Sequence, residues 1–267
     1  MTDNQPTQPE SDAHADQLVL TGERTVPGID AENYWFRRHE VAYEYILDRC
    51  AGLDVLEAGS GEGYGASMLA TRAKSVTCVD YDEQAVAHTR HRYPELIVHQ
   101  GNLIDLPLAD GSVDVVVNFQ VIEHLWDQSA FVAECHRVLR PGGVLLMSTP
   151  NRITFSPGRD TPLNPFHTRE LNAAEMTELL TVVPTCTGFQ VQQMLGVFHG
   201  ATLKALDEKW GGSIIDAQIE RALAGTPWPD ELTADVAAVT TADFDISPSD
   251  VADIDASLDL FAVAVRR

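Results

Sequence analysis

Residues 53–65 read Leu-Asp-Val-Leu-Glu-Ala-Gly-Ser-Gly-Glu-Gly-Tyr-Gly, an apolar run that ends at Glu57 and leads into glycines at alternate positions. Because glycine has no Cβ and readily adopts positive φ, such a loop can turn tightly and let a ligand approach the backbone. A carboxylate directly before the turn suits a ligand of the nucleoside type. The alternative is a strand-to-helix turn that binds nothing.

Beyond this loop, segments typical of strands alternate with segments typical of helices. Strands are predicted over residues 54–57, 75–80, 96–100, 113–118, 143–149, 189–195 and 258–265. Helices are predicted over residues 30–50, 65–73, 83–93, 128–139 and 213–223. This alternation predicts an α/β fold with a doubly wound, mostly parallel sheet and helices on both faces. Arg140-Pro141-Gly142-Gly143 is predicted to form a stop and a turn before the fifth strand.

The two ends of the chain differ from this pattern. Residues 1–19 are polar and acidic without a basic residue, which predicts a disordered tail before a single domain over residues 20–267. From Gly200 to Asp259 the chain carries 13 acidic residues against 3 basic ones. We expect residues 200–257 to be an acidic insertion before the last strand. Two interpretations stay open: a lid or wall of a substrate site, and a contact between copies, as in a homodimer.

Composition limits the partners of this protein. With 267 residues, 44% of them hydrophobic, the chain can bury one sizeable core. Its formal net charge of −22 repels phosphate backbones and anionic lipid, so we expect neither nucleic acid nor a membrane as a partner. No apolar run approaches the roughly 18 residues of a membrane span. The four cysteines lack metal-binding spacing, and we expect reduced thiols in a cytoplasmic protein; they are Cys50, Cys78, Cys135 and Cys186.

Polar residues mark the ends of the predicted strands, where ligands of doubly wound sheets bind. Asp80 ends the second strand, and its carboxylate can accept both hydroxyls of a ribose. Asn102 and Leu103 follow the third strand and suit the edge and the face of an adenine. A dinucleotide-binding protein is an alternative, because Gly61-x-Gly63-x-x-Ala66 with Asp80 matches its loose fingerprint. The acidic Glu57 before the glycines argues against it.

A series of motifs over about residues 35–150 resembles the class I S-adenosylmethionine-dependent methyltransferases. The matching pieces are residues 55–63, Val79-Asp80, Asp105-Leu106-Pro107-Leu108, residues 112–116, residues 121–125 and residues 137–143. The resemblance implies a seven-stranded sheet with S-adenosylmethionine as cofactor. It implies that the loop 57–63 holds the methionine part and that residues 33–39 close over the cofactor, with Arg38 at its carboxylate. The implied cofactor-binding residues are Tyr34, Arg38, Glu57, Gly59, Ser60, Gly61, Asp80, Tyr81, Asn102, Leu103, Asn118 and Phe119.

Methyl transfer from a sulfonium is an in-line displacement, so the protein must align the acceptor and handle its proton. Glu123 and His124 leave the fourth strand beside the expected methyl site and are candidate catalytic residues. His167 follows the fifth strand and can arch over the same edge as a ligand or a base. His199 is a further, weaker candidate.

The segment 118–126 resembles more closely a set of methyltransferases that act on sugar and phenol hydroxyls. They carry Glu-x-x-Glu-His and hold a divalent ion with it, which would lower the pKa of the acceptor hydroxyl. The resemblance implies a site for Mg²⁺ or Mn²⁺ made by Glu123, His124 and His167, and imidazole ligands favour the softer ion. This chain has Gln120 in place of the first glutamate, and an amide is a weaker ligand.

Acidic and aromatic residues in one insertion suit a carbohydrate acceptor. Almost the whole chain resembles the mycobacterial methyltransferases associated with methylmannose polysaccharide, through residues 33–39, 118–128, 148–170, 211–218 and 235–244. That likeness implies O-methylation of a short mannoside at its 1-hydroxyl. The alternatives are a quinone or phenol O-methyltransferase, an RNA methyltransferase, which the charge of −22 disfavours, and a cofactor-binding module without turnover.

Overall fold

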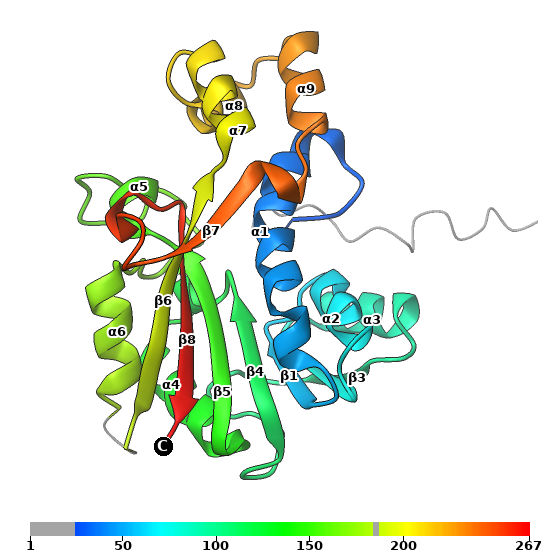
Figure 1. Ribbon diagram of the computed structural model, residues 1–267. Helices are drawn as coiled ribbons and strands as arrows, with labels where there is room; N and C mark the ends of the chain where they lie inside the picture. The colour runs from blue at the N-terminus through cyan, green and yellow to red at the C-terminus, as the bar shows by residue number, and fades with distance from the viewer. Residues whose placement is uncertain (1–24, 184–186) are drawn as a thin grey trace, which may run out of the picture.

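The computed structural model describes residues 25–183 and 187–267 (Figure 1). The predicted disordered tail and Cys186 lie outside the described residues. One sheet of eight strands has the order β3-β2-β1-β4-β5-β8-β6-β7. Its strands are β1 (Asp54–Ala58), β2 (Ser75–Asp80), β3 (Ile97–Gln100), β4 (Val113–Phe119), β5 (Leu139–Pro150), β6 (Phe189–His199), β7 (Phe244–Pro248) and β8 (Asp259–Arg266).

The five strands β1 to β5 pair in parallel, as the alternation of strands and helices predicts. β8 runs antiparallel between β5 and β6, and β7 pairs antiparallel with β6. The predicted α/β sheet is confirmed, but the expected number of seven strands is wrong. The additional strand is β7, which lies in the stretch expected to be an insertion and pairs with an end of β6 that runs on to His199.

The predicted turn before the fifth strand is also wrong in detail. β5 already begins at Leu139, which pairs with Val113, while Val144 pairs with Val115, so the register shifts between the two pairs. The residues between them form a bulge, which keeps the proline out of the ladder of hydrogen bonds. A Cβ at Gly143 would lie 2.9 Å from two backbone oxygens, so only glycine fits there.

Helices cover both faces of the sheet (Figure 1). The helices are α1 (Asn33–Ile46), α2 (Tyr64–Ala70), α3 (Glu83–Arg92), α4 (Gln128–Val138), α5 (Arg152–Phe155), α6 (Ala173–Thr181), α7 (Ala201–Lys209), α8 (Ile214–Ala224) and α9 (Asp230–Ala237). Successive side chains of a strand point to opposite faces. On β5, Leu145 and Met147 therefore pack in one core with α4 and α6, whereas Leu146 packs in a second core with α1, α2 and α3.

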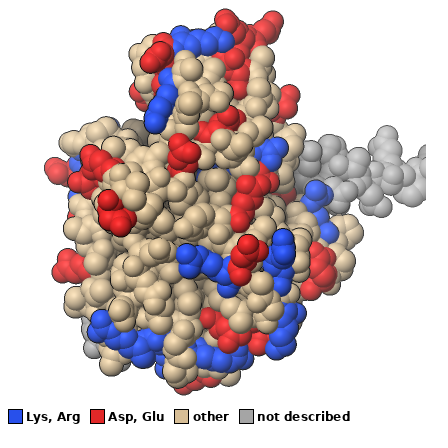
Figure 2. All heavy atoms as spheres, in the orientation of Figure 1, with Lys and Arg blue, Asp and Glu red and all other residues tan. Residues whose placement is uncertain are grey.

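A third core lies beyond the carboxyl ends of the parallel strands. There α7, α8 and α9 form an outer subdomain, residues 201–243, at the top of Figure 1. Its apolar side chains pack against the first turns of α1 and against β7 through Tyr34, Val41 and Phe244. In the view of Figure 2, acidic side chains gather over this subdomain, in accord with the acidic composition of the stretch.

Short 3₁₀ helices connect several of these elements. They are η1 (Asp30–Glu32), η2 (Leu47–Cys50), η3 (Ile122–His124), η4 (Thr241–Asp243) and η5 (Ile254–Ala256). Within the described part of the chain, no helix combines the length and the apolar character that crossing a membrane requires. The three described cysteines are buried and form no disulfide.

Candidate active site

The glycine loop, residues 59–63, joins β1 to α2 at the carboxyl edge of the sheet. Gly59, Gly61 and Gly63 have φ values of +84°, +49° and +83°, which other residues rarely adopt. A Cβ at Gly59 would lie 2.7 Å from the side chain of Val121, so this glycine lets the loop approach the segment after β4. A Cβ at Gly61 would meet no described atom within 4 Å. The space beside Gly61 is open to a ligand that packs on bare backbone.

Glu57 lies beneath this loop. Its carboxylate Oε1 accepts a hydrogen bond from the Tyr43 hydroxyl at 2.7 Å, and its Oε2 has no partner among the described residues. Burial raises the pKa of Glu57 to about 8, although the bonds from Tyr43 and from the Ala66 N–H lower it. A Cβ at Gly65 would lie 2.3 Å from the Tyr43 ring and 2.6 Å from Glu57 Oε1, so residue 65 must be glycine.

Asp80 ends β2 directly beside the loop. Its Oδ2 accepts the N–H of Gly61 at 2.8 Å, and its Oδ1 accepts the N–H of Asp82 at 3.0 Å. The carboxylate therefore fixes the backbone of the glycine loop, and it lies at the strand end where the sequence places a ribose. Ser60, the remaining predicted residue of the loop, is buried.

Helix α3 holds the same loop from the other side, which sequence reasoning missed. His88 Nε2 lies 2.6 Å from Glu62 Oε2 in a buried pair, and the Thr89 hydroxyl donates to the Gly61 carbonyl at 3.1 Å. A Cβ at Gly63 would lie 2.6 Å from the Thr89 methyl group. No motif marks the two α3 residues, because their partners lie far back in the chain.

The two residues predicted to contact an adenine lie differently. Asn102 is exposed after β3, and its Oδ1 accepts the N–H of Ile104 at 3.1 Å. Leu103 is buried and packs in the core with α4 and α6. Tyr81, beyond the end of β2, is 67% exposed. Of these three side chains, the structure leaves Asn102 and Tyr81 accessible for a base.

Replacing Asp80 with alanine is expected to weaken cofactor binding by roughly 10- to 100-fold, because the glycine loop loses the charge-assisted hydrogen bond of Gly61 and the ligand loses the carboxylate. Calorimetric titration with S-adenosylhomocysteine measures the affinity. Glu83→Ala is the matched control, since it removes an exposed carboxylate on the neighbouring helix α3. Unchanged affinity in the Asp80 variant would contradict the assignment.

The ends of β1 and β4 are linked by Asn118. Its Nδ2 donates to the Ala58 carbonyl at 2.8 Å, while its buried Oδ1 has no partner among the described residues. Phe119 instead packs in the core, edge-on to Tyr43 and Phe261 with ring centroids 5.0 and 5.3 Å away. Asn118 thus offers a free acceptor at the strand end, and Phe119 supports the sheet.

Three predicted residues are not joined to the glycine loop. The Arg38 guanidinium donates to both carboxylate oxygens of Asp259, at 2.6 and 2.7 Å, and to a backbone carbonyl. The Tyr34 hydroxyl lies 2.6 Å from His199 Nε2, and His199 Nδ1 lies 2.6 Å from Asp207. These contacts tie α1 to β8 and to the outer subdomain. The predicted cofactor contacts of Tyr34 and Arg38 stay predictions.

Gln120 turns the chain out of β4. It has a φ of +56°, the one positive value outside glycine among the described residues, and such strain is typical of functional segments. Its backbone N–H donates to the Ser148 carbonyl at 2.9 Å, and its side-chain amide donates to the Ser148 hydroxyl at 3.1 Å. The amide Nε2 is therefore held on β5, and a weak contact of the amide oxygen with a cation stays a prediction.

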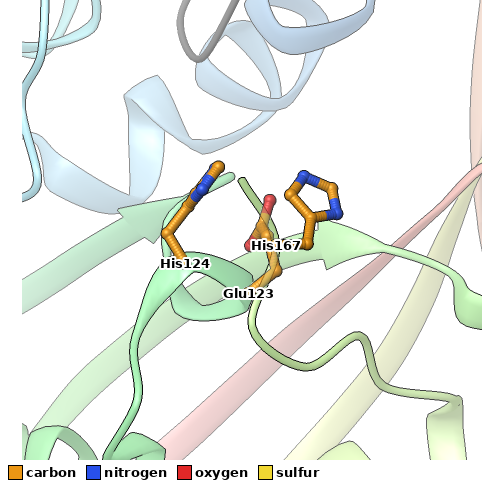
Figure 3. Close-up of side chains that lie close together, drawn as sticks. All are labelled: Glu123, His124 and His167. Carbon is orange, nitrogen blue, oxygen red and sulfur yellow. The ribbon is translucent and has the colours of Figure 1, made fainter. Parts of the chain in front are cut away.

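Glu123, His124 and His167 come together at this edge (Figure 3). One ligand-type atom from each lies within 4.8 Å of the other two. The Glu123 side chain is almost fully buried, with 1% exposure, and its Oε2 accepts from the Thr149 hydroxyl at 2.9 Å. The two imidazole rings stand edge to face, 4.9 Å apart. We call these three residues the acid–imidazole cluster.

The segment before α6 brings His167 into this cluster. Thr168 docks it, because its N–H donates to the Glu123 carbonyl at 2.7 Å and its hydroxyl donates to the Leu125 carbonyl at 2.7 Å. His167 Nδ1 lies 2.7 Å from the buried Glu170 carboxylate, and the Asn164 amide lies 3.1 Å from Nε2. Nδ1 therefore donates to Glu170, and Nε2 accepts from the Asn164 amide, a bond that a cation at Nε2 would replace.

Burial sets the protonation of the cluster. It raises the pKa of Glu123 to about 7, while the neighbouring His167 lowers it. Burial and then His167 lower the pKa of His124 to about 4, so His124 is neutral at neutral pH. Its Nδ1 lies 3.1 Å from the Phe166 carbonyl, which can only accept. The proton is thus on Nδ1, and Nε2 is free to take a proton or to bind a cation.

The donor chemistry of the cluster fits a divalent cation. One carboxylate and two imidazoles converge, and Glu170 orients His167 as carboxylates orient metal-binding histidines. Two nitrogen donors suit Mn²⁺ or a later transition metal better than Mg²⁺. The partners Thr149, Asn164 and Glu170 were missed by sequence reasoning, since no motif marks the contacts that they make in the folded chain.

Comparisons with known proteins bear on the family and the fold of this chain. Residues 56–147 match the family model described as a methyltransferase domain. The chain is 67% identical, over 93% of its length and 95% of the relative, to a protein of Mycolicibacterium smegmatis named a probable S-adenosylmethionine-dependent methyltransferase. A protein of the same name from Mycobacterium tuberculosis is 63% identical over 99% of this chain and 94% of that one.

The fold has counterparts among solved structures. A Thermotoga maritima structure described as an S-adenosylmethionine-dependent methyltransferase, possible histamine N-methyltransferase, superposes with a TM-score of 0.58. The match covers 87% of this chain and 93% of that one at 17% sequence identity. At that identity the likeness shows the fold alone.

Proposed function

This chain belongs to the class I S-adenosylmethionine-dependent methyltransferases, and on that premise we propose that it methylates a sugar hydroxyl. The observation that carries the proposal is the acid–imidazole cluster at the carboxyl edge of the sheet. It follows the strand that borders the glycine loop, and the Val121 side chain packs against Gly59. The Asn118 side chain links the same two strands. An acceptor at the cluster therefore lies beside a methyl donor held by the loop.

The cofactor supplies an activated methyl group, so the residues of this chain must orient the acceptor and remove its proton. His124 is neutral and directs Nε2 away from the Phe166 carbonyl, which makes it the base that takes the hydroxyl proton. Glu123 is ionised above about pH 7 and stabilises the resulting imidazolium. His167 is held by Glu170 and closes the third side of the acceptor site.

We propose that the same three residues can bind a divalent cation, and His124 is then a ligand of that cation instead of the base. When bound, such a cation would lower the pKa of the acceptor hydroxyl. EDTA is then expected to abolish turnover, and Mn²⁺ is expected to restore it better than Mg²⁺. Titration of Mn²⁺ followed by its paramagnetic resonance signal gives a second readout, in which His167→Ala weakens binding. Full turnover in EDTA would leave His124 as a base without a metal.

Within the sugars, we propose the 1-hydroxyl of a short mannoside. The resemblance of residues 148–170 and 211–218 to methyltransferases associated with methylmannose polysaccharide supports this choice. An anomeric hydroxyl is more acidic than other sugar hydroxyls, which suits a histidine base. The test is turnover of labelled S-adenosylmethionine against mannosides with the 1-hydroxyl free or blocked, beside phenol and quinol acceptors. Product from phenols alone would overturn the proposal.

A further inference from the structure

Trp126 is the most exposed large hydrophobic side chain of the described residues, with 92% of its surface accessible. It follows His124 by two residues, so the fold displays it beside the acid–imidazole cluster. A tryptophan carries roughly 150–250 Å² of apolar surface, and leaving that surface in water forgoes the free energy of its burial. The packing of the fold gives no reason for a tryptophan at this position.

The exposure does not come from a loose loop. On one side of Trp126, the Leu125 N–H donates to the Ile122 carbonyl at 3.1 Å, and the Leu125 carbonyl accepts from the Thr168 hydroxyl at 2.7 Å. On the other side, the Asp127 carboxylate caps α4 by accepting the Ala130 N–H at 2.9 Å. Hydrogen bonds therefore hold the backbone on both sides of the ring.

Exposure rises steeply along this segment. Glu123 is 1% exposed, His124 is half-buried, and Trp126 is 92% exposed. Four consecutive residues thus lead from the depth of the site, where the reacting hydroxyl must lie, to its mouth. Trp126 is placed to contact a part of the acceptor farther out than the reacting group.

Two further aromatic residues contact the cluster, one through its ring and one through its backbone carbonyl. Phe155 stacks on the His167 ring, with centroids 5.4 Å apart and planes at 29°. Phe166 is 43% exposed, and its carbonyl lies 3.1 Å from His124 Nδ1. We call Trp126, Phe155 and Phe166 the aromatic rim: Phe155 and Phe166 contact the acid–imidazole cluster, and Trp126 follows His124 by two residues.

We infer that the aromatic rim is an acceptor subsite, in which Trp126 stacks on the sugar ring next to the one that is methylated. The inference rests on the proposed function. The apolar face of a pyranose covers an aromatic ring, and its hydroxyls stay in water or meet polar neighbours such as the exposed Asp127 and Ser129. A sugar can therefore stack on an exposed aromatic ring whose neighbours are polar.

The exposed area argues against a second copy of the chain as the occupant. Trp126 and Phe166 together expose roughly 200–300 Å² of aromatic surface at the usual size of these side chains. A stable dimer needs about 800 Å² from each partner. The rim matches one small ring system better than a protein surface.

The test compares Trp126→Ala with the wild type on a mannose monosaccharide acceptor and on the corresponding disaccharide. We expect KM for the disaccharide to rise about five- to tenfold, with kcat and the KM for S-adenosylmethionine within twofold. KM for the monosaccharide should not change. Trp126→Phe should recover most of the loss. Leu223→Ala, which removes an equally isolated exposed side chain on α8, should behave as wild type.

A binding readout accompanies the kinetics. Titration of the disaccharide in the presence of S-adenosylhomocysteine should change tryptophan fluorescence in the wild type and not in Trp126→Phe. Unchanged kinetics in Trp126→Ala, with sugars still methylated, would overturn the inference alone, and so would an equal effect on both acceptors. A dimer that dissociates in Trp126→Ala would assign the ring to a second copy. A wild type that methylates no sugar would overturn the proposed function together with the inference.

Discussion

Replacing Glu123 with glutamine lowers kcat by at least about 10²-fold and leaves the affinity for S-adenosylhomocysteine within about twofold. Glutamine keeps the shape of the side chain and can still accept the hydrogen bond that the Thr149 hydroxyl donates at 2.9 Å. It cannot carry a charge, so it neither stabilises an imidazolium at His124 nor binds a cation as a carboxylate does. Single-turnover rates with saturating acceptor and calorimetric titration of the cofactor product measure the two effects.

Glu123→Gln should also change the pH dependence of the methyl-transfer rate. Burial raises the pKa of Glu123 to about 7, and the ionised form is the active one, so the wild-type rate should rise with pH through about 7. Glutamine does not titrate, and the variant should lack this limb. A retained limb near pH 7 would assign the titration to another group.

The stability of Glu123→Gln shows whether a loss of turnover comes from lost chemistry or from unfolding. Because the folded state holds the Glu123 proton more tightly than the unfolded chain, this carboxyl makes the free energy of unfolding smaller as the pH rises through about 7. At pH 8, Glu123→Gln should therefore be at least as stable as the wild type. Glu178→Gln, on the exposed side of α6, is the matched control and should keep wild-type turnover and stability. Full turnover in Glu123→Gln would remove this residue from the chemistry.

The parallel half of the sheet could be predicted because its strands are short apolar runs bounded by glycines and carboxylates. The loop after β1 and Asp80 at the end of β2 mark strand ends, and parallel strands bring such ends to one edge. Local sequence thus predicts both the fold class and the edge that holds the site.

The antiparallel half was harder for a physical reason. β7 has only five residues and lies in the predicted acidic insertion. Its pairing partner on β6 lies far away in the chain, so no local pattern marks it as a strand. In the parallel half, the sequence predicts a turn where β5 has its bulge opposite β4, since proline and glycines stop a strand locally unless a neighbouring strand holds the chain extended. Both errors come from pairing over long sequence separations.

The acid–imidazole cluster was named from adjacency and from a later histidine, and the structure brings those three residues together. What the sequence could not supply is the orientation of each side chain. That depends on Thr149, which the pairing of β4 with β5 brings to Glu123, on Glu170 beside His167, and on Phe166, which meets His124 when the segment before α6 docks on η3. The pairing of the Arg38 guanidinium with Asp259 inside the fold could likewise not be predicted from the sequence.

Replacing Arg38 with methionine should lower the free energy of unfolding by about 3–5 kcal/mol, because it leaves the Asp259 carboxylate buried without a partner. The two side chains are 3% and 1% exposed and share two hydrogen bonds, at 2.6 and 2.7 Å. The pair joins α1 to the start of β8, so its loss loosens the helix on the sheet. Denaturant unfolding followed by circular dichroism measures the change.

Further variants test whether the Arg38–Asp259 pair stabilises the fold or Arg38 binds the cofactor. Arg37→Met, on the same helix and paired with Glu40 at the surface, should cost under about 1 kcal/mol. Arg38→Met combined with Asp259→Leu should regain much of the stability, since no charge then stays buried alone. Titration of folded Arg38→Met with S-adenosylhomocysteine tests the predicted contact with the cofactor, and wild-type affinity would contradict that contact. A variant of unchanged stability that no longer binds the cofactor product would instead place Arg38 at the cofactor carboxylate, because the guanidinium would then have to exchange Asp259 for the ligand.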